Sequence, residues 1–221
     1  MRLLDRVDLG RVLDLMCGVG GHLHALMAEG IGWQSYTGVD VSSVVLDAAR
    51  SSRPAHPRVR FVNADVVRWC AEPGASDTVL LMYEALNALG PEQSAVVLRA
   101  IATALAPGGL ALVDAALATG PPQTGHAAAQ LSDPHRLVLS SAVDAGSTAD
   151  EHHMEHTAHH LFAGDCLLHF GYRWWAPSRA RMRDLFHDAG LKIRSEHQAH
   201  AGIASDKPSV PNAVQFVLGK R

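Results

Sequence analysis

Apolar and polar positions follow two different patterns along this chain. Through the first two-thirds, short apolar and β-branched runs are separated by amphipathic segments, which is typical of a parallel sheet with crossover helices. The apolar runs predict strands at residues 11–15, 35–40, 58–63, 77–82 and 109–114. The amphipathic segments predict helices at residues 20–29, 42–50 and 92–105, with a short helix at 66–71.

The pattern changes after Asp114. Residues 120–123 are glycine and proline rich and predict a loop. Alternating polarity then predicts strands at residues 136–143, 153–162 and 166–174, followed by a helix at 178–189 and strands at 191–197 and 212–218. A turn at Gly164 and Asp165 should join the second and third of these strands. We therefore expect an α/β fold in one domain over residues 1–221: a doubly wound, mostly parallel seven-stranded sheet with an inserted antiparallel flap at 120–176.

Composition limits the partners and the environment. The 221 residues are 48% hydrophobic and 19% charged, which is ordinary for a globular protein. A net charge of -3 gives no electrostatic reason to expect a nucleic acid or an anionic membrane. Three widely spaced cysteines and no apolar run long enough to cross a bilayer favour a cytoplasmic protein with reduced thiols. We expect a small-molecule substrate, no nucleic acid and no membrane.

A glycine turn follows the first predicted strand. Gly18 and Gly20 stand between an apolar run and a helix start, where a missing side chain lets the backbone approach a ligand at the strand ends. Asp40 ends the second strand, where a carboxylate can accept both ribose hydroxyls. Asp65 follows the third strand and can accept from an adenine amino group. Together these positions predict a nucleotide-type ligand.

Two ligands fit such a site, NAD and S-adenosylmethionine (SAM). The dinucleotide fingerprint needs a third glycine, and Leu23 occupies its position. Asp14, just before the glycines, would repel a diphosphate but suits the ammonium group of SAM. The local charge therefore favours SAM. A purely structural interpretation remains open for two acids: Asp14 could cap the helix near Gly20, and Asp65 could cap the short helix after it.

The motifs resemble those of class I SAM-dependent methyltransferases that act on small molecules. They are L-D-L-x-C-G-x-G, G-V-D-V-S, N-A-D and L-A-P-G-G, at residues 13–20, 38–42, 63–65 and 105–109, with further similarity at 77–89 and 172–191. The resemblance implies a Rossmann-like methyltransferase fold, S-adenosyl-L-methionine as cofactor, and methylation of a small-molecule acceptor. The cofactor-binding residues that it implies are Asp14, Cys17, Gly18, Gly20, Asp40, Val41, Ala64, Asp65, Val66 and Met82.

The sequence departs from the family pattern at its start. Ten residues precede Arg11, where the family usually places a helix or more over the cofactor and the acceptor. We expect the flap, or a second subunit of a homodimer, to close the acceptor side.

The best-placed polar groups for chemistry follow the fourth strand, because ligands bind outside the carboxyl ends of strands. By the resemblance, Tyr83 flanks the sulfonium together with Met82. Glu84 is expected to accept a proton or hold an amine, and Asn87 to orient the acceptor. The alternative is that Glu84 caps the next turn and Asn87 ties down a loop.

Five histidines lie within residues 152–160. In a strand, His152, His156 and His160 share one face; in a helix, several become neighbours that can chelate a metal. The surrounding residues favour a strand. We therefore expect His156 as an acceptor-pocket base, His152 and His160 as substrate contacts, and no metal. Solvated histidines are the alternative. Trp174 is expected to contact the substrate, with core packing as its alternative.

Other functions fit the same motifs. An enzyme that cyclises or transfers the aminocarboxypropyl chain of SAM needs the same cofactor contacts. A nicotinamide-dependent oxidoreductase and a non-catalytic SAM-binding subunit belong to different classes. Methyl transfer is the prediction that the motifs favour.

Overall fold

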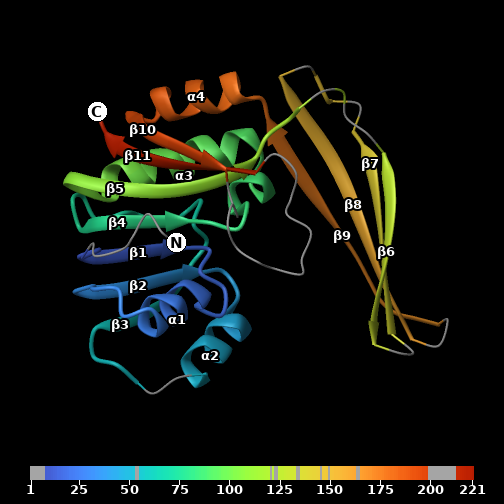
Figure 1. The fold of residues 1–221 in the computed structure, drawn as a ribbon, viewed down its shortest axis with the longest axis horizontal. Helices are drawn as coiled ribbons and strands as arrows, with labels where there is room; N and C mark the ends of the chain where they lie inside the picture. The colour runs from blue at the N-terminus through green and yellow to red at the C-terminus, as the bar shows by residue number, and fades with distance from the viewer. Residues whose placement is uncertain are drawn as a thin grey trace.

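The computed structural model describes residues 8–52, 55–119, 121, 124–132, 135–144, 146–148, 150–162, 165–198 and 213–221. Within these ranges the chain forms two sheets (Figure 1). The larger sheet has seven strands in the order β10-β11-β5-β4-β1-β2-β3, and the smaller has four in the order β6-β7-β8-β9.

Five strands of the large sheet run parallel: β1 (Arg11–Leu15), β2 (Ser35–Asp40), β3 (Val59–Asn63), β4 (Ser76–Leu81) and β5 (Leu105–Ala116). At the β5 edge, β11 (Ala213–Lys220) pairs antiparallel with β5, and β10 (Leu191–Gln198) pairs antiparallel with β11, so β10 runs in the same direction as the five parallel strands. The strand order reverses between β1 and β4, and such a switch point is where open α/β sheets bind ligands.

The helices are α1 (Gly21–Ala28), α2 (Ser43–Ser51), α3 (Gly90–Ala104) and α4 (Arg179–Asp188), with one 3-10 turn, η2 (Ala85–Ala88). The Ser42 hydroxyl accepts from the Val45 amide at 3.3 Å, and this N-cap sets the start of α2. Ser178 caps α4 in the same way, with the Arg181 amide at 3.1 Å. Gly190, with φ of 77°, follows α4 in a conformation that glycine adopts without strain.

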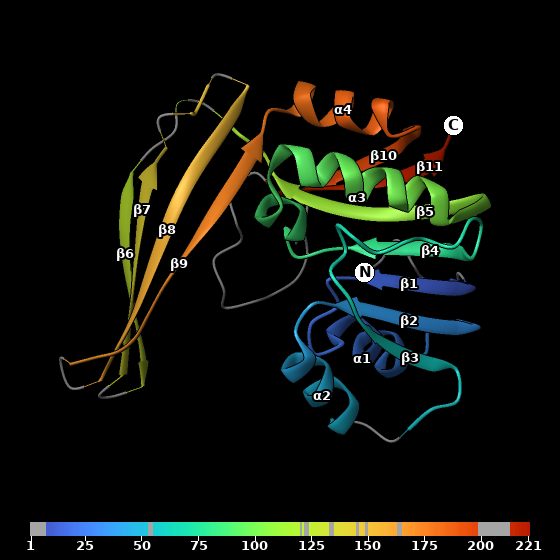
Figure 2. The ribbon, with the colours of Figure 1, turned by 180° about the vertical axis from the view of Figure 1, so that it is seen from behind.

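Both faces of the large sheet are covered, because successive residues of a strand point to opposite sides. Leu13 and Val79 belong to the apolar cluster that includes residues of α3 and α4. Val12 and Leu80 belong to a second cluster with residues of α1. In the rear view, α3 lies in front of the sheet (Figure 2). The arrangement confirms the predicted doubly wound α/β fold.

The short helix predicted at residues 66–71 is wrong. The Arg68 amide donates to the Asp65 carbonyl at 3.0 Å and closes a turn, after which the chain has no regular structure up to residue 72. Starting a helix fixes several residues for one hydrogen bond, so a segment of this length forms only a turn. The β5 strand is also longer than the predicted 109–114 at both ends.

The predicted antiparallel flap is a four-stranded sheet. Its strands are β6 (Gly125–Ser132), β7 (His135–Val143), β8 (Glu151–Phe162) and β9 (Asp165–Pro177). The sequence pattern missed β6. The predicted loop at 120–123 lies mostly outside the described residues, as do Gly164 and Asn212. The flap stands beyond the carboxyl ends of the parallel strands in both views (Figures 1 and 2).

Candidate active site

Backbone strain is concentrated at the carboxyl edge of the large sheet, which is the side at which its parallel strands end. Among the described residues, Met16, Tyr83 and Glu84 are the non-glycine residues with positive φ, at 54°, 62° and 51°. Met16 directly follows β1, and Tyr83 and Glu84 come just after β4. Each such residue costs on the order of 1–3 kcal/mol and persists only where surrounding contacts enforce it, which is common at functional sites.

The glycine turn is open towards this edge. Gly18 and Gly20 have φ of 55° and 74°, and Gly20 caps α1. A Cβ added at Gly18 would meet no atom within 4 Å, so a ligand can approach the backbone there. The Cys17 side chain is buried, and a Cβ added at Gly38 would lie 2.8 Å from its sulfur. Cys17 therefore contributes packing through its thiol and only backbone to the open side.

Asp40 ties the glycine turn to the start of α2. Its two oxygens accept from the Gly18 and Ser42 amides, each at 2.9 Å. The carboxylate keeps spare acceptor positions, and the residue is partly exposed. Next to it, Val41 is 70% exposed, and Val19 on the glycine turn is 56% exposed. Large apolar side chains exposed beside a carboxylate suit a ligand with an apolar face and hydroxyl groups.

The predicted adenine region lies after β3. Asp65 accepts from the Val67 amide at 2.9 Å, and its side chain is 44% exposed with Arg68 3.8 Å away. Val66 is buried in the main core, and Ala64 is partly buried against it. The Asp65 carboxylate therefore stabilises the turn at 66–68 and still faces solvent.

Asp14 has partners different from the predicted ammonium group. It is 0% exposed, and its carboxylate accepts from the Tyr36 hydroxyl and lies 3.0 and 3.1 Å from Nδ1 of His22. The carboxylate is enclosed by residues of β2 and α1, and its contact with the ammonium group of SAM stays a prediction. Burial lowers the pKa of His22, but the hydrogen bond and charge of Asp14, with the charge of Asp114, leave that pKa above its ordinary value.

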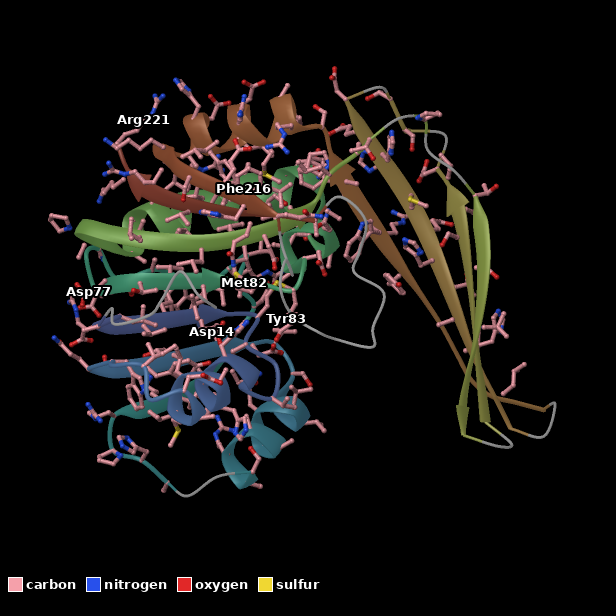
Figure 3. The ribbon with its side chains drawn as sticks, viewed as in Figure 1. Asp14, Asp77, Met82, Tyr83, Phe216 and Arg221 are labelled. Atoms are coloured by element: carbon pink, nitrogen blue, oxygen red, sulfur yellow. The ribbon has the colours of Figure 1, made fainter. Side chains whose placement is uncertain are left out.

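The strained turn after β4 is held by an acid that sequence reasoning did not select. Asp114, at 1% exposure, accepts from the Tyr83 amide at 3.0 Å and from the Glu84 amide at 2.7 Å. Glu84 is buried, whereas Tyr83 is 68% exposed and stacks on His22 with ring centroids 5.0 Å apart. Asp14, Met82 and Tyr83 lie at the same end of the sheet, opposite Asp77 (Figure 3). The signal for Asp114 was its place at the end of the strand predicted at residues 109–114.

Two other predicted residues support the scaffold. The Asn87 amide donates to the carbonyls of Ala116 and Trp175 at 2.8 and 2.6 Å, and its oxygen accepts from the Ala116 amide at 2.9 Å. The alternative interpretation of Asn87, that it ties down a loop, therefore describes its contacts. Met82 is partly buried, and its sulfur lies 3.7 Å from Nε2 of Gln215 on β11.

The histidine-rich segment is strand β8, as predicted. Nδ1 of His156 lies 2.8 Å from the Ser141 hydroxyl, and its ring stacks on Tyr172 at 4.9 Å and meets Trp174 edge-on at 6.2 Å. Burial lowers the pKa of His156 below its ordinary value, so the neutral base form is favoured.

His152 lies on the same face of β8 as His156, because four residues separate them along the strand. It is 6% exposed, and its Nε2 has no hydrogen-bond partner among the residues that the structure describes. Buried polar groups are normally paired, so an orphaned nitrogen points to a missing ligand or water. His160 pairs with Leu168 along the backbone, and its side chain lies outside the described residues.

A cavity of about 530 Å³ opens between the start of α3 and the β8–β9 pair. Asn87 and Trp174, both predicted as substrate residues, lie in its lining with Glu92, Asp144 and His153. None of the predicted cofactor-binding residues lines it. Within the described ranges, no three His, Cys, Asp or Glu side chains are grouped as a metal site, and no helix is long and apolar enough to cross a membrane.

Residues 12–109 match the family described as Methyltransferase domain. A curated relative, the trans-aconitate 2-methyltransferase of Paracidovorax citrulli (strain AAC00-1), is 35% identical over 111 residues. The aligned segment is 49% of this chain and 40% of the relative, so the chain spans about two-fifths of that protein's length.

Solved structures share the fold over nearly the whole chain. A SAM-dependent methyltransferase from Clostridium acetobutylicum ATCC 824 superposes with a TM-score of 0.73 at 13% identity, covering 99% of this chain and 87% of that one. A SAM-bound amino pentose methyltransferase from Micromonospora echinaspora superposes with a TM-score of 0.66 at 18% identity, covering 96% and 84%.

The family match covers the glycine turn and the acids that end β1 and β2, and the structural similarity extends through the flap. These are the features that the sequence motifs predicted. Residues 12–109 therefore match a methyltransferase family, and the chain as a whole has the fold of solved SAM-dependent methyltransferases.

Proposed function

We propose that this protein transfers a methyl group from SAM to a small-molecule acceptor that carries an amine or hydroxyl group. The observation that carries the proposal is the open carboxyl edge between Gly18 and Tyr83. There, the space beside the Gly18 backbone is open to a ligand, and strained turns and exposed apolar side chains lie at the same edge. Strain and exposed apolar surface both cost free energy, which a bound ligand offsets.

The chain's own residues fit the parts of this cofactor. Asp40 offers carboxylate acceptors for two ribose hydroxyls, and Val41 beside it offers an apolar contact for the adenine ring. The Gly18 backbone allows close approach of the methionine part. When bound, SAM supplies an electrophilic methyl group at its sulfonium, and the protein has to align a nucleophile with it and exclude water.

The flap is the proposed acceptor cover. His156 and His152 share one face of β8, and Tyr172 and Trp174 are in ring contact with His156. A neutral His156 accepts a proton from the acceptor nitrogen or oxygen, since its lowered pKa keeps it in the base form at neutral pH. Nε2 of His152, which has no partner in the described part of the chain, is suited to hydrogen-bond an acceptor hydroxyl. Similarity in fold to an amino pentose methyltransferase supports amino sugars as the first acceptors to test.

The test is product analysis with SAM and a panel of amino sugars, neutral sugars and small carboxylic acids. Methyl transfer gives S-adenosylhomocysteine and an acceptor heavier by one methyl group. Production of methylthioadenosine instead would assign transfer or cyclisation of the aminocarboxypropyl chain and contradict the proposal. A methylated carboxylic acid with no methylated sugar would keep methyl transfer and overturn the acceptor class.

A further inference from the structure

His22 links four elements at the candidate cofactor site. It lies in the first turn of α1, its Nδ1 contacts Asp14 of β1, and that carboxylate also accepts from Tyr36 of β2. Its ring stacks on Tyr83, which follows β4, with an interplanar angle of 17°. A hydrogen bond to one edge and a stacked ring on one face leave the imidazole a single orientation.

The two ring nitrogens have different surroundings. Nδ1 is occupied by Asp14, whose side chain is fully buried, while 19% of the His22 side chain is exposed. Nε2 lies across the ring from Nδ1, and within the described residues the hydrogen bonds of the His22 ring are those of Nδ1. In the imidazolium form, both nitrogens carry a proton, so Nε2–H is a charge-assisted donor directed away from the buried carboxylate.

The positively charged Nε2–H group of His22 calls for a hydrogen-bond acceptor beside the glycine turn. Gly18 and Gly20 lie a few residues before His22 and line the region where the methionine part of SAM is proposed to bind. That part carries one anionic group, its carboxylate. The buried acids here, Asp14 and Asp114, are already bonded within the chain, so a carboxylate on a ligand would meet His22 as its cationic neighbour.

We propose that His22, oriented by Asp14 and Tyr83, binds the carboxylate of the methionine moiety of SAM through Nε2–H. Asp14 thus serves the cofactor indirectly, by fixing and charging the imidazole. The inference rests on the proposed function, because it assigns a residue to one end of the same ligand.

The experiment compares two ligands that differ in one group. S-adenosylhomocysteine and its decarboxylated analogue share the adenosine, thioether and amine, and only the first has a carboxylate. In His22→Asn, the amide can still donate to Asp14, but the outer N–H is gone. Calorimetry should show affinity for S-adenosylhomocysteine reduced about tenfold or more, the size expected for one charge-assisted hydrogen bond. Affinity for the decarboxylated analogue should stay within about twofold.

The matched control is His24→Asn, which changes an exposed histidine of the same helix and should leave both affinities unchanged. An equal loss for both ligands in His22→Asn would mean that His22 only supports the fold. Unchanged binding of S-adenosylhomocysteine would also overturn the proposal. Failure of the unaltered protein to bind either ligand would instead overturn the proposed function.

A pH series on the unaltered protein tests the same point without a substitution. The groups facing His22 are Asp14 from β1, Tyr36 from β2, Asp114 from β5 and Tyr83 after β4. The imidazolium is present below the raised pKa of His22 and lost above it. Affinity for S-adenosylhomocysteine should therefore fall as pH rises through that pKa, relative to the decarboxylated analogue. In His22→Asn, the ratio of the two affinities should not change with pH, and a parallel pH dependence in both proteins would contradict the assignment.

Discussion

The carboxyl edge of the large sheet and the β8–β9 pair of the flap differ in whether their buried polar groups have hydrogen-bond partners within the chain. At the edge, Asp14, Asp40 and Asp114 each have at least two partners within the chain. On the flap, Nε2 of the buried His152 has none within the described ranges. The acids of the edge are therefore paired within the chain, as the proposed cofactor site requires, whereas the proposed acceptor would supply a partner for His152 on the flap.

The two regions meet at Trp175. This side chain of β9 is 2% exposed within the main core, its indole donates to Glu151 at 3.0 Å, and its carbonyl accepts from Asn87. The β8–β9 pair is thus anchored to the sheet by a large buried ring, which lies on the face opposite to that of His156, because Trp175 pairs with His153.

The largest expected effect is at this joint. Trp175→Ala should lower the free energy of unfolding by about 3–5 kcal/mol, because it leaves a cavity in the main core. Urea unfolding measures it. Tyr172→Ala, on the same strand but 41% exposed, is the matched control and should cost much less. Equal losses for the two variants would show that the flap is not anchored through Trp175.

Removing the proposed base separates catalysis from cofactor binding. His156→Ala should lower kcat about 100-fold with SAM affinity kept, because general base catalysis is lost while the edge is untouched. In the unaltered protein, kcat should fall as pH drops through the lowered pKa of His156, since protonation removes the base, and the variant should lack that limb. His159→Ala changes the opposite face of β8 and should be nearly silent. Loss of SAM binding in the His156 variant would contradict the proposal that the flap serves catalysis and the carboxyl edge binds the cofactor.

At the edge, Asp40→Ala should weaken SAM binding about tenfold, because the ribose hydroxyls lose a charged acceptor. The melting temperature without ligand should change little, since the carboxylate is partly exposed and bonds two amides at turns. Calorimetry and thermal unfolding give the two readouts. An unchanged affinity would mean that another group binds the ribose.

The smallest effect is expected at the opposite end of the same sheet, where Asp77 pairs with Arg11 at 2.9 Å (Figure 3). The hydrogen bond to Arg11 lowers the pKa of Asp77 to about 2. Any stability it adds is present above its ordinary pKa and is lost as pH falls through about 2. Asp77→Asn should shift the melting temperature by no more than about 2 °C and leave SAM binding unchanged, because the pair is exposed. A tenfold loss of SAM affinity in Asp77→Asn would contradict the assignment of the SAM site to the carboxyl edge alone.

Short-range pattern was enough to predict the parallel strands, the glycine turn and the place of Asp40. Contacts between elements far apart in sequence were not predictable in this way. Asp14 stands beside the glycines in the sequence, but its burial depends on Tyr36 and on His22, which other elements bring to it. Asp114 acts on a turn that lies 30 residues earlier in the chain. The missed strand β6 is alanine rich, with low strand propensity, and it forms through pairing with β7.

The most direct test of a SAM site at the carboxyl edge is calorimetric titration of the unaltered protein with SAM, S-adenosylhomocysteine and NAD. Asp40 and the open glycine turn suit a ribose in all three ligands, but the acids of this edge and the position of Leu23 disfavour a diphosphate. We expect about one equivalent of SAM or S-adenosylhomocysteine bound and no response to NAD. Tight binding of NAD with no response to SAM would contradict it.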